Sequence, residues 1–588
     1  MRSVLGITTA AILCGLGAAP AQAQSFDSVV AFGDSLSDGG NIADLFNLPP
    51  ARFTTNPGLT TVENIAGAYG LTLEASRLGG DNYAYGGAGF LIGGVPDLTT
   101  QAETYLAAHE TISPNALFFV WGGANDVFSY GVQTPDVAGP GLRAAAQAEG
   151  ALLDLLQDAG ARNIIVVNLP DIGLTVGGTP NDTALVNIYN EELNAQLAGR
   201  TGIIPVNAFA LLREVAANPA AFGITNVTTP ACTVSSLFCT ENTLVEPGAD
   251  QTYLFADDVH PTAVAHAAMA QVILAEISAP GQISMLSTAP FALLRAHRSS
   301  VQQELQQTHG AGGRVFIDAS AGQRDFDGDV NVPPSESDDD RITFGGLARS
   351  QNGLAFGAAL SLGQSDMRVG GAATTVDART IFASAFARKE WGNLAWTSAQ
   401  LGYGFTDYND IERSFSYGQT IRTEAAETSG DTVSAEIAAG RLFDAGSLRL
   451  GPFASLAYDR IEVDRFAETS GDATAMRFGA QERESATARL GVDLLGSLAW
   501  RGVSMRPDLR LAYAHDFDDG ANSVRAGLTT MNGAFDMPGF ATPEGWTEAS
   551  LGLGFVFGNG LVARFAYDGA WADNIEDNAG SASVSLHF

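Results

Sequence analysis

The chain has 588 residues, with 65 acidic and 31 basic side chains and a formal net charge of −34. This excess of acid excludes nucleic acid as a partner, because no basic surface is available to neutralise phosphates. The length corresponds to about three or four average domains, although β-barrels run long as single units.

The first 23 residues have the organisation of a secretory signal peptide. Arg2 supplies the positive charge, residues 4–16 form an apolar run, and Ala21-Gln22-Ala23 is a small-residue cleavage site. The run is too short to anchor the chain stably in a bilayer. We therefore expect the protein to be exported and residues 1–23, including Cys14, to be removed.

Two cysteines remain in the exported chain, Cys232 and Cys239. An even pair at short spacing in an oxidising compartment predicts a disulfide that closes a small loop, with two free thiols as the alternative. After residue 23 we identify no apolar stretch long enough for a membrane helix. Any membrane span is therefore expected to be built from β-strands.

Residues 24–281 alternate short apolar runs with alanine-rich stretches. The runs predict buried parallel strands at 28–32, 116–121 and 163–168. The alanine-rich stretches predict helices at 141–160 and 263–277, and Ala279-Pro280-Gly281 is expected to end the second of them. Strands that alternate with helices predict an α/β domain with a doubly wound sheet.

A polar segment of helical composition follows at 290–309. Pro290 suits the first turn of a helix, and the glycines of residues 310–313 terminate it. Such a helix would be about 30 Å long, close to the thickness of a bilayer core. It is too polar to face lipid, so we expect it to run through the pore of a barrel; an ordinary interdomain helix is the alternative.

From residue 314 onward the apolar residues recur with a period of two. In the last eight residues, Ala582, Val584, Leu586 and Phe588 share one face and alternate with polar residues. A final strand that ends on an aromatic residue is typical of an outer-membrane barrel, in which it closes the cylinder and leaves no open edge in lipid. We therefore predict that residues 314–588 form a transmembrane β-barrel in a bacterial outer membrane.

The connections between the predicted strands alternate between tight turns and long polar segments, as periplasmic turns and outer loops do. The tight turns fall at 350–353, 390–393, 443–447, 500–502 and 558–560, and the long segments at 323–341, 369–378, 407–431 and 462–484. Counting 522–532 as a strand would leave the chain end on the wrong side of the membrane. We therefore assign it to a large outer loop, 516–545, which leaves 12 spanning strands.

Four short segments of the α/β region carry residues suited to catalysis. Ser35 directly follows the first predicted strand, at the sheet edge where open α/β sheets bind ligands, although a serine there is by itself more often a helix cap. The other segments are the glycine-rich 82–88, then 123–126 after the second strand, then 257–262 before the last helix. Each alone has a structural explanation; their fixed order on one domain favours a catalytic one.

The four segments read FGDSLSD, NYAYGGA, GAND and DDVHPT, and in this order they resemble the GDSL or SGNH hydrolase family. Together with the predicted barrel, the whole chain resembles the autotransporter esterases of that family. The resemblance implies a three-layer, flavodoxin-like α/β passenger attached to the barrel. It also implies a cell-surface esterase or lipase that cleaves carboxylic esters through an acyl-enzyme.

Site residues follow from the resemblance position by position. Ser35 is the expected nucleophile, His260 its base, and Asp257 the acid that orients the imidazole, with neighbouring Asp258 as the alternative. The expected oxyanion hole comprises the backbone N–H groups of Ser35 and Gly87 and the side-chain amide of Asn125. Structural roles are expected for four further motif residues, Asp34, Asp38, Asn41 and Asp126. His266 is expected to be a packed or surface histidine.

No Cys/His cluster or phosphate-binding loop stands out, so we expect neither a metal nor a cofactor. The expected partners are an ester or lipid substrate, outer-membrane lipid and the barrel-assembly machinery, for a monomeric protein. The expected division is a signal peptide at 1–23, the passenger at 24–281, a linker and pore helix at 282–313, and the barrel at 314–588. A catalytically inactive surface adhesin and a free porin-like channel are the alternative functions.

Overall fold

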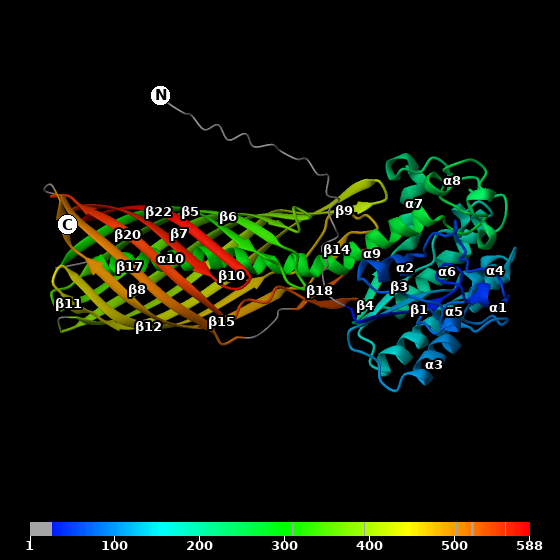
Figure 1. Cartoon of the computed structure of the whole chain (residues 1–588), viewed down its shortest axis with the longest axis horizontal. Coiled ribbons are helices and arrows are strands. Elements are labelled where there is room, and N and C mark those ends of the chain that lie inside the picture. Colours follow the sequence, from blue (N-terminus) through cyan, green and yellow to red (C-terminus); the bar gives the residue numbers. More distant parts are fainter. Residues whose placement is uncertain (1–25, 308–310, 393, 501–502, 519–522, 559) are drawn as a thin grey trace, which may run out of the picture.

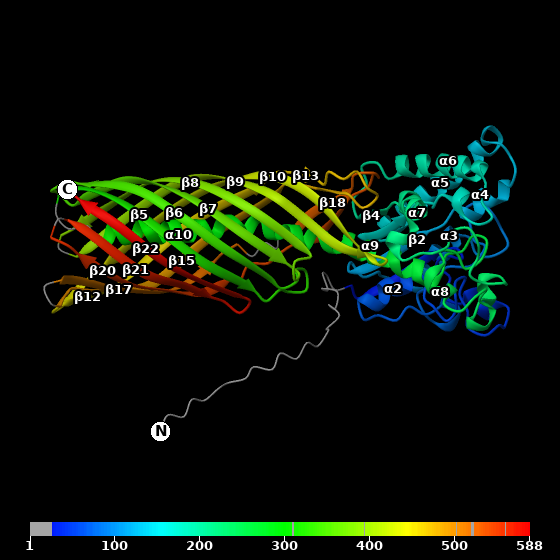
Figure 2. The same cartoon turned by 90° about the horizontal axis from the view of Figure 1, so that it is seen from above.

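The computed structural model describes residues 26–307, 311–392, 394–500, 503–518, 523–558 and 560–588, so the expected signal peptide lies outside it. An α/β domain and a β-barrel lie end to end, and one helix passes from the first into the second (Figures 1 and 2). The disposition of these two parts decides what surrounds the candidate site.

A parallel sheet forms the centre of the α/β domain. Its strands lie in the order β1 (Ser28–Gly33), β2 (Ala116–Trp121), β3 (Asn163–Val167) and β4 (Ile203–Val206). The strands are apolar and almost completely buried, as in a sheet covered by helices on both faces. The helices are α1 (Asn41–Leu45), α2 (Thr61–Ala68), α3 (Leu98–Ala108), α4 (Ala124–Tyr130), α5 (Pro135–Asp158), α6 (Pro180–Gln196), α7 (Ala208–Ala217), α8 (Ala249–Thr252) and α9 (Ala263–Ser284).

β1 is paired with β2 along one edge and with residues 81–85 along the opposite edge. Ala31 N–H donates to the Asp81 carbonyl at 3.1 Å, and Tyr83 N–H donates to the Ala31 carbonyl at 2.8 Å. The chain therefore runs from β1 to one side of the sheet and then returns to add β2 on the other side. This confirms the flavodoxin-like arrangement and places a topological switch point between β1 and β2, where open α/β sheets bind ligands.

The last passenger helix continues into the barrel. The expected end at Ala279-Pro280-Gly281 is wrong: α9 runs on to Ser284, followed by a 3₁₀ turn (Met285–Thr288) and α10 (Ala289–Gln307). Proline removes one backbone hydrogen bond, but residues 279–284 are all buried, and their packing offsets that loss.

The helical run Ala263–Gln306 contains a window that is apolar enough, by composition, to cross a membrane. The sequence pattern had not led us to expect such a stretch after residue 23. The run is packed within the protein instead. At its passenger end α9 lies against α2 and the extension of β9 (Ala395–Tyr417). Inside the barrel α10 lies against β6 (Ser335–Arg349), β7 (Leu354–Val369) and β8 (Thr374–Trp391).

The expected pore helix is confirmed. Inside the barrel, His297 bonds through its two ring nitrogens to Ser361 Oγ at 2.6 Å and Ser384 Oγ at 2.7 Å. Arg298 forms an ion pair with Asp459, and Ser300 donates to Asp318 Oδ1 at 2.9 Å. The polar face of α10 is thus paired with polar residues of the inner wall, which explains why so polar a helix occupies the centre of a membrane barrel.

Twelve strands close the barrel, as expected. They are β5 (Gly312–Phe326), β6 (Ser335–Arg349), β7 (Leu354–Val369), β8 (Thr374–Trp391), β9 (Ala395–Tyr417), β10 (Thr420–Arg441), β12 (Leu448–Val463), β15 (Gln481–Gly496), β17 (Val503–Asp516), β20 (Gly545–Val556), β21 (Leu561–Trp571) and β22 (Ile575–His587). Each pairs with its neighbour in sequence, and β22 pairs with β5 to complete the ring. Two short strands, β11 (Phe443–Ala445) and β16 (Leu498–Trp500), extend the turns at one end.

The two faces of the wall match the alternating sequence pattern. On the last strand Val584 and Leu586 are exposed, as is Phe588 directly after it, whereas Ser583 and Ser585 are buried. Such an apolar outer face with polar residues inside is the arrangement required of a strand between lipid and a polar lumen.

Two of the predicted outer loops are much shorter than expected, whereas those at 462–484 and 516–545 lie close to their predicted bounds. Residues 369–378 and 407–431 were expected to be long loops, but β7 and β8 are joined by only 370–373, and β9 and β10 by Gly418 and Gln419. Polar residues in these segments continue the antiparallel ladder beyond the bilayer. The 23-residue β9 is about twice the length that a tilted strand needs to cross the hydrocarbon core. Its outer half therefore projects toward the passenger (Figure 1).

Two outer loops form a small sheet between barrel and passenger. It contains β13 (Phe466–Ala467), β14 (Met476–Phe478), β18 (Ser523–Leu528) and β19 (Phe535–Pro538). The described part of 522–532 is thus outside the barrel, as predicted, although it contains a strand. Ile203 N–H of β4 donates to the Ala534 carbonyl at 2.9 Å, and Ala534 N–H donates to the Arg200 carbonyl at 3.1 Å. The loop therefore pairs with the free edge of the passenger sheet.

A buried ion pair joins the outer part of β9 to this small sheet. Arg413, on the outer part of β9, donates from Nε and Nη2 to the Glu468 carboxylate, at 2.8 Å in each case, and both side chains are at most 3% exposed. Removing one partner of such a pair leaves an uncompensated buried charge, which costs about 3–5 kcal/mol.

We predict that Arg413→Met lowers the free energy of unfolding by about 3–5 kcal/mol. The matched control is Arg460→Met, because Arg460 pairs with Glu462 and Glu482 while about 40–50% exposed, where solvent screens the interaction and the effect on stability should be small. Urea unfolding of the detergent-solubilised protein, followed by near-UV circular dichroism, measures both. Equal effects of the two substitutions would contradict a buried ion pair at the junction.

Candidate active site

Three side chains from distant parts of the passenger form a continuous hydrogen-bonded chain. Ser35 lies in the turn after β1, and His260 Nε2 is 2.9 Å from its Oγ. On the other side of the ring, His260 Nδ1 lies 2.9 Å from Asp257 Oδ1 and 3.0 Å from Oδ2. An imidazole held in this way by a carboxylate presents the unprotonated Nε2 to the hydroxyl, which is the tautomer that can accept its proton.

The Asp257 carboxylate is fixed by the backbone. Oδ1 accepts from the N–H groups of Val259 at 3.1 Å and His260 at 2.9 Å, and Oδ2 accepts from Ser236 N–H at 2.8 Å. Burial alone would raise the pKa of Asp257, but the hydrogen bonds from His260 and Ser236 and the positive charge of an imidazolium outweigh burial and lower it far below its usual range. The acid therefore remains ionised beside the imidazole.

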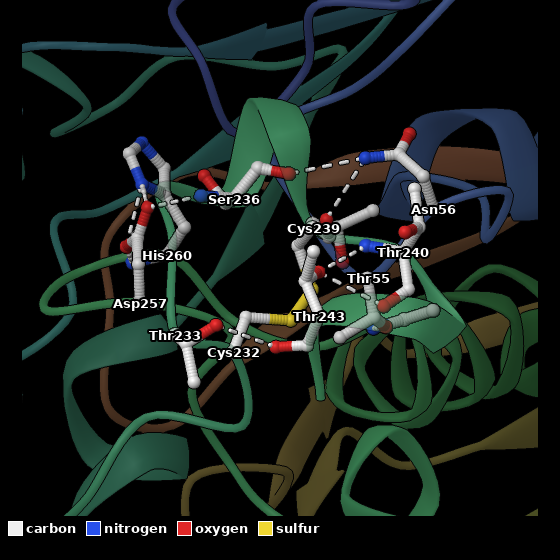
Figure 3. The surroundings of a disulfide bond; sticks show 12 residues. Thr55, Asn56, Cys232, Thr233, Ser236, Cys239, Thr240, Thr243, Asp257 and His260 are labelled. Atoms are coloured by element: carbon white, nitrogen blue, oxygen red, sulfur yellow. Dashed lines mark hydrogen bonds and ion pairs between the residues drawn. A yellow bond between two sulfur atoms is a disulfide. The ribbon is translucent and has the colours of Figure 1, made fainter. Parts of the chain in front are cut away.

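Ser236 belongs to a loop closed by a disulfide. Cys232 and Cys239 are joined, with their Cα atoms 5.7 Å apart, and the loop between them lies beside Asp257 (Figure 3). Asn56 Nδ2 donates to the Ser236 carbonyl at 3.0 Å, which fixes this peptide from the opposite side. The disulfide thus supports the donor that holds the acid.

The candidate oxyanion donors lie around the carboxyl end of β1 and β2. Gly87 has φ +86°, and a Cβ added to it would meet no atom within 4 Å, so this peptide borders open space. Gly86 N–H, in contrast, donates to Asp38 Oδ2 at 2.9 Å. Asn125 Nδ2 donates to the Ala88 carbonyl at 2.8 Å, and its second hydrogen makes only a long contact of 3.5 Å with Asp34 Oδ2, which a better acceptor could replace.

The four motif residues expected to be structural are buried and bonded to backbone groups. The Asp38 carboxylate accepts from three N–H groups of residues 40–42 at 2.6–3.1 Å, in addition to Gly86. Asn41 Nδ2 donates to the carbonyls of Asn82 and Ala84, at 2.7 and 2.9 Å. Asp126 accepts from Phe90 and Leu91 N–H at 2.8 and 2.9 Å. These bonds hold the nucleophile turn, the glycine-rich segment and the turn after β2 together.

Two residues that competed for catalytic roles lie elsewhere. The Asp258 side chain is exposed to solvent. His266 is buried in α9, where its Nδ1 accepts from Thr61 N–H at 3.2 Å, and burial lowers its pKa to about 3. It is a packed, neutral histidine, as the sequence indicated. In the described ranges no cluster of three His, Cys, Asp or Glu side chains is arranged to hold a metal ion.

Two supporting residues were missed from the sequence. Gln101 of α3 is 1% exposed and forms two hydrogen bonds with the backbone of Gly33, just before the nucleophile turn. Its Oε1 accepts from Gly33 N–H at 2.9 Å, and its Nε2 donates to the Gly33 carbonyl at 3.0 Å. Ser236 contacts the acid through its backbone, which no residue type encodes. The only available signal for it was its position inside the disulfide loop.

The charge state of Asp34 depends on burial. Its side chain is 1% exposed, and burial raises its pKa to about 7. The folded protein therefore keeps this proton to a higher pH than the unfolded chain, whose carboxyl titrates near 3.8. Its contribution to stability is complete below about pH 4 and is lost as the pH rises through 7.

We predict that Asp34→Asn reduces this loss, because the amide keeps an acceptor for Leu36 N–H, 3.0 Å away in the native protein, and carries no charge. Between pH 4 and 8 the free energy of unfolding should fall less in the variant than in the wild type, by on the order of 4 kcal/mol. Denaturant unfolding across this pH range measures the difference. Parallel curves for the wild type and Asp34→Asn would contradict the prediction.

Comparison with known proteins gives two family matches on this one chain. A family described as GDSL-like Lipase/Acylhydrolase matches residues 29–273, and the Autotransporter beta-domain matches residues 315–568. Among solved structures, the translocator domain of the autotransporter NalP from Neisseria meningitidis is similar to the barrel, with 20% identity, 51% of this chain and 98% of that chain covered, and a TM-score of 0.43.

Two curated relatives match almost the whole chain. Esterase EstA of Pseudomonas aeruginosa is 30% identical over 649 aligned residues, covering 99% of this chain and 98% of the relative. Lipase 1 of Photorhabdus luminescens is 26% identical, covering 91% of this chain and 92% of the relative. The chain therefore belongs to the family of GDSL-type surface esterases and lipases that are exported through their own autotransporter barrel, with the barrel in the outer membrane and the passenger at the cell surface.

Proposed function

We propose that this protein is a serine esterase or lipase that hydrolyses carboxylic esters, fatty acyl esters among them. The observation that carries the proposal is the hydrogen-bonded chain from Ser35 through His260 to Asp257 at the topological switch point of the sheet. A serine hydroxyl is a weak nucleophile unless a positioned base removes its proton, and this arrangement supplies that base.

The proposed reaction has two halves. Ser35 Oγ attacks the ester carbonyl carbon while His260 Nε2 takes the hydroxyl proton, and Asp257 stabilises the imidazolium that forms. The carbonyl oxygen becomes an oxyanion, which the N–H groups of Ser35 and Gly87 and the amide of Asn125 stabilise. The tetrahedral intermediate collapses, and His260 donates its proton to the departing alcohol, leaving an acyl-enzyme. Water then repeats the sequence and releases the acid.

The proposed domain division follows the predicted one: signal peptide 1–23, passenger 24–281, linker and pore helix 282–313, and barrel 314–588. Since lipid offers no hydrogen bonds to an unpaired strand, the barrel is proposed to require the cell's barrel-assembly machinery during insertion. A single chain closes the ring by itself, because β22 pairs with β5, which supports a monomer.

We predict that Ser35→Ala abolishes hydrolysis of p-nitrophenyl butyrate by whole cells. Loss of a triad nucleophile costs about 10⁶-fold in kcat, and binding and the oxyanion hole leave a rate only about 10³–10⁴-fold above that in water. A fluorophosphonate probe should label the wild type at Ser35 and leave the variant unlabelled. Wild-type hydrolysis rates in Ser35→Ala would refute the mechanism. An unlabelled wild-type protein would favour the adhesin alternative.

The adjacent acids allow a matched test of the third residue. We predict that Asp257→Asn lowers kcat by about 10³–10⁴-fold, because the amide cannot stabilise the imidazolium and favours the wrong tautomer. Asp258→Asn removes an equal charge one residue away, from an exposed side chain, and should change kcat by about twofold or less. Steady-state kinetics on purified protein compares the two. Similar losses in both variants would indicate a loop effect in place of a specific acid.

A further inference from the structure

An apolar cavity of about 120 Å³ lies beside the candidate triad. One end is bordered by Leu36, which follows the nucleophile, and by Val259 and Pro261, which flank the base. From there it runs along the first turns of α9, past Ala265 and Ala268. The cavity therefore starts at residues directly adjacent to Ser35 and His260 in the chain, although these two residues do not themselves line it.

The other end of this cavity is formed by the barrel. Tyr417 and Gly418, at the tip of the β9–β10 hairpin, line it together with Phe222 of the passenger. Gly418 N–H donates to Gln271 Oε1 at 2.9 Å, two turns beyond the first lining residues of α9. The β9–β10 hairpin thus contacts α9 farther along the helix than the lining residues nearest to Ser35. Residues nearly 400 positions apart, on two domains, enclose one space.

The hairpin is fixed in this position by contacts on both of its strands. Tyr417 is 4% exposed; its hydroxyl donates to the Leu211 carbonyl at 3.1 Å, and its ring centre lies 4.7 Å from that of Phe222. Arg422, on the return strand, forms an ion pair with Glu214 at 2.6 Å. A side chain held by a hydrogen bond, a ring contact and a neighbouring ion pair is a defined wall.

We propose that this cavity binds the acyl chain of the ester, and that the barrel residue Tyr417 sets the longest chain it accepts. The proposal rests on the proposed esterase function, since it assigns the acyl side of the same site. The lining is almost entirely aliphatic and aromatic, which suits an alkyl chain and excludes a sugar or a charged group. Each methylene buried in it should raise kcat/KM about fourfold, until the chain reaches Tyr417.

The test uses full-length protein in isolated outer membranes and p-nitrophenyl esters of increasing acyl length. For the wild type, kcat/KM should rise with chain length and then fall. Tyr417→Ala removes the ring at the end of the cavity, so its maximum should move to longer chains. Relative to the wild type, kcat/KM should gain about fourfold for each methylene beyond the original maximum. Tyr417→Phe keeps the ring and should keep the wild-type profile.

A second variant changes the cavity in the opposite direction. Ala268→Leu, on the passenger side, fills the middle of the cavity and should move the maximum to shorter chains. Tyr458→Ala is the matched control on the barrel, because Tyr458 is 41% exposed on β12 and is not among the residues that line the cavity. Its profile should equal that of the wild type.

Hydrolysis of p-nitrophenyl acetate separates failure of this proposal from failure of the proposed function. Acetate has no chain to fill the cavity, so its kcat/KM reports on the triad alone. It should stay within about twofold in Tyr458→Ala and be lost in Ser35→Ala. Unchanged chain-length profiles in Tyr417→Ala and Ala268→Leu, with acetate activity intact, would overturn the acyl-site assignment alone. Acetate hydrolysis that persists in Ser35→Ala would overturn the esterase mechanism itself.

Discussion

The pairing of backbone hydrogen-bonding groups is the constraint on which both parts of this molecule depend. An unpaired strand edge is costly in lipid and is a site of unwanted association in water. The barrel meets the constraint by joining β22 to β5. The passenger sheet meets it by pairing β1 with residues 81–85 at one edge and β4 with Ala534 of a barrel loop at the other. The enzyme domain is therefore completed by the membrane domain.

This completion changes what the barrel does for the site. A flexible tether would leave the passenger free to rotate. Here the outer loops contribute Met531, Phe535 and Phe540 to the same buried core as the passenger sheet. The β9–β10 hairpin, held by Tyr417 and Arg422, borders the cavity beside the candidate triad. Outer strands twice as long as the membrane requires are explained by this contact, since only the extended part can reach the passenger.

Much of the fold was predictable because its signals are local. Buried strands of the passenger appear as short apolar runs, and the barrel wall appears as an alternation that Val584 and Leu586 display on the last strand. The motif residues around Ser35, Asn125 and His260 were identified by residue type and order. What the sequence left out depends on tertiary contacts.

Three features illustrate that limit. Pro280 suggested a helix end, but burial of the surrounding turn keeps α9 continuous, and no local pattern records that burial. The polar segment 407–431 suggested a loop, but most of it belongs to β9 and β10. Outside the membrane an antiparallel ladder needs no apolar face, so the sequence pattern that marks the other strands is missing there. Ser236 supports Asp257 through its N–H, a group that every residue except proline carries. In each case the deciding interaction lies between residues that are distant in sequence or involves the backbone alone.

The backbone just before α9 fixes both the base and the acid of the candidate triad. His260 lies three residues before α9 begins at Ala263, and its own N–H donates to Asp257 Oδ1 at 2.9 Å. In the proposed acylation step His260 becomes an imidazolium. The Asp257 carboxylate, held by the imidazole and by three backbone N–H groups, supplies the opposing negative charge 2.9 Å from the ring. The acid thus has a charge-compensating role in the proposed reaction, and the same short turn that holds the acid also positions the base.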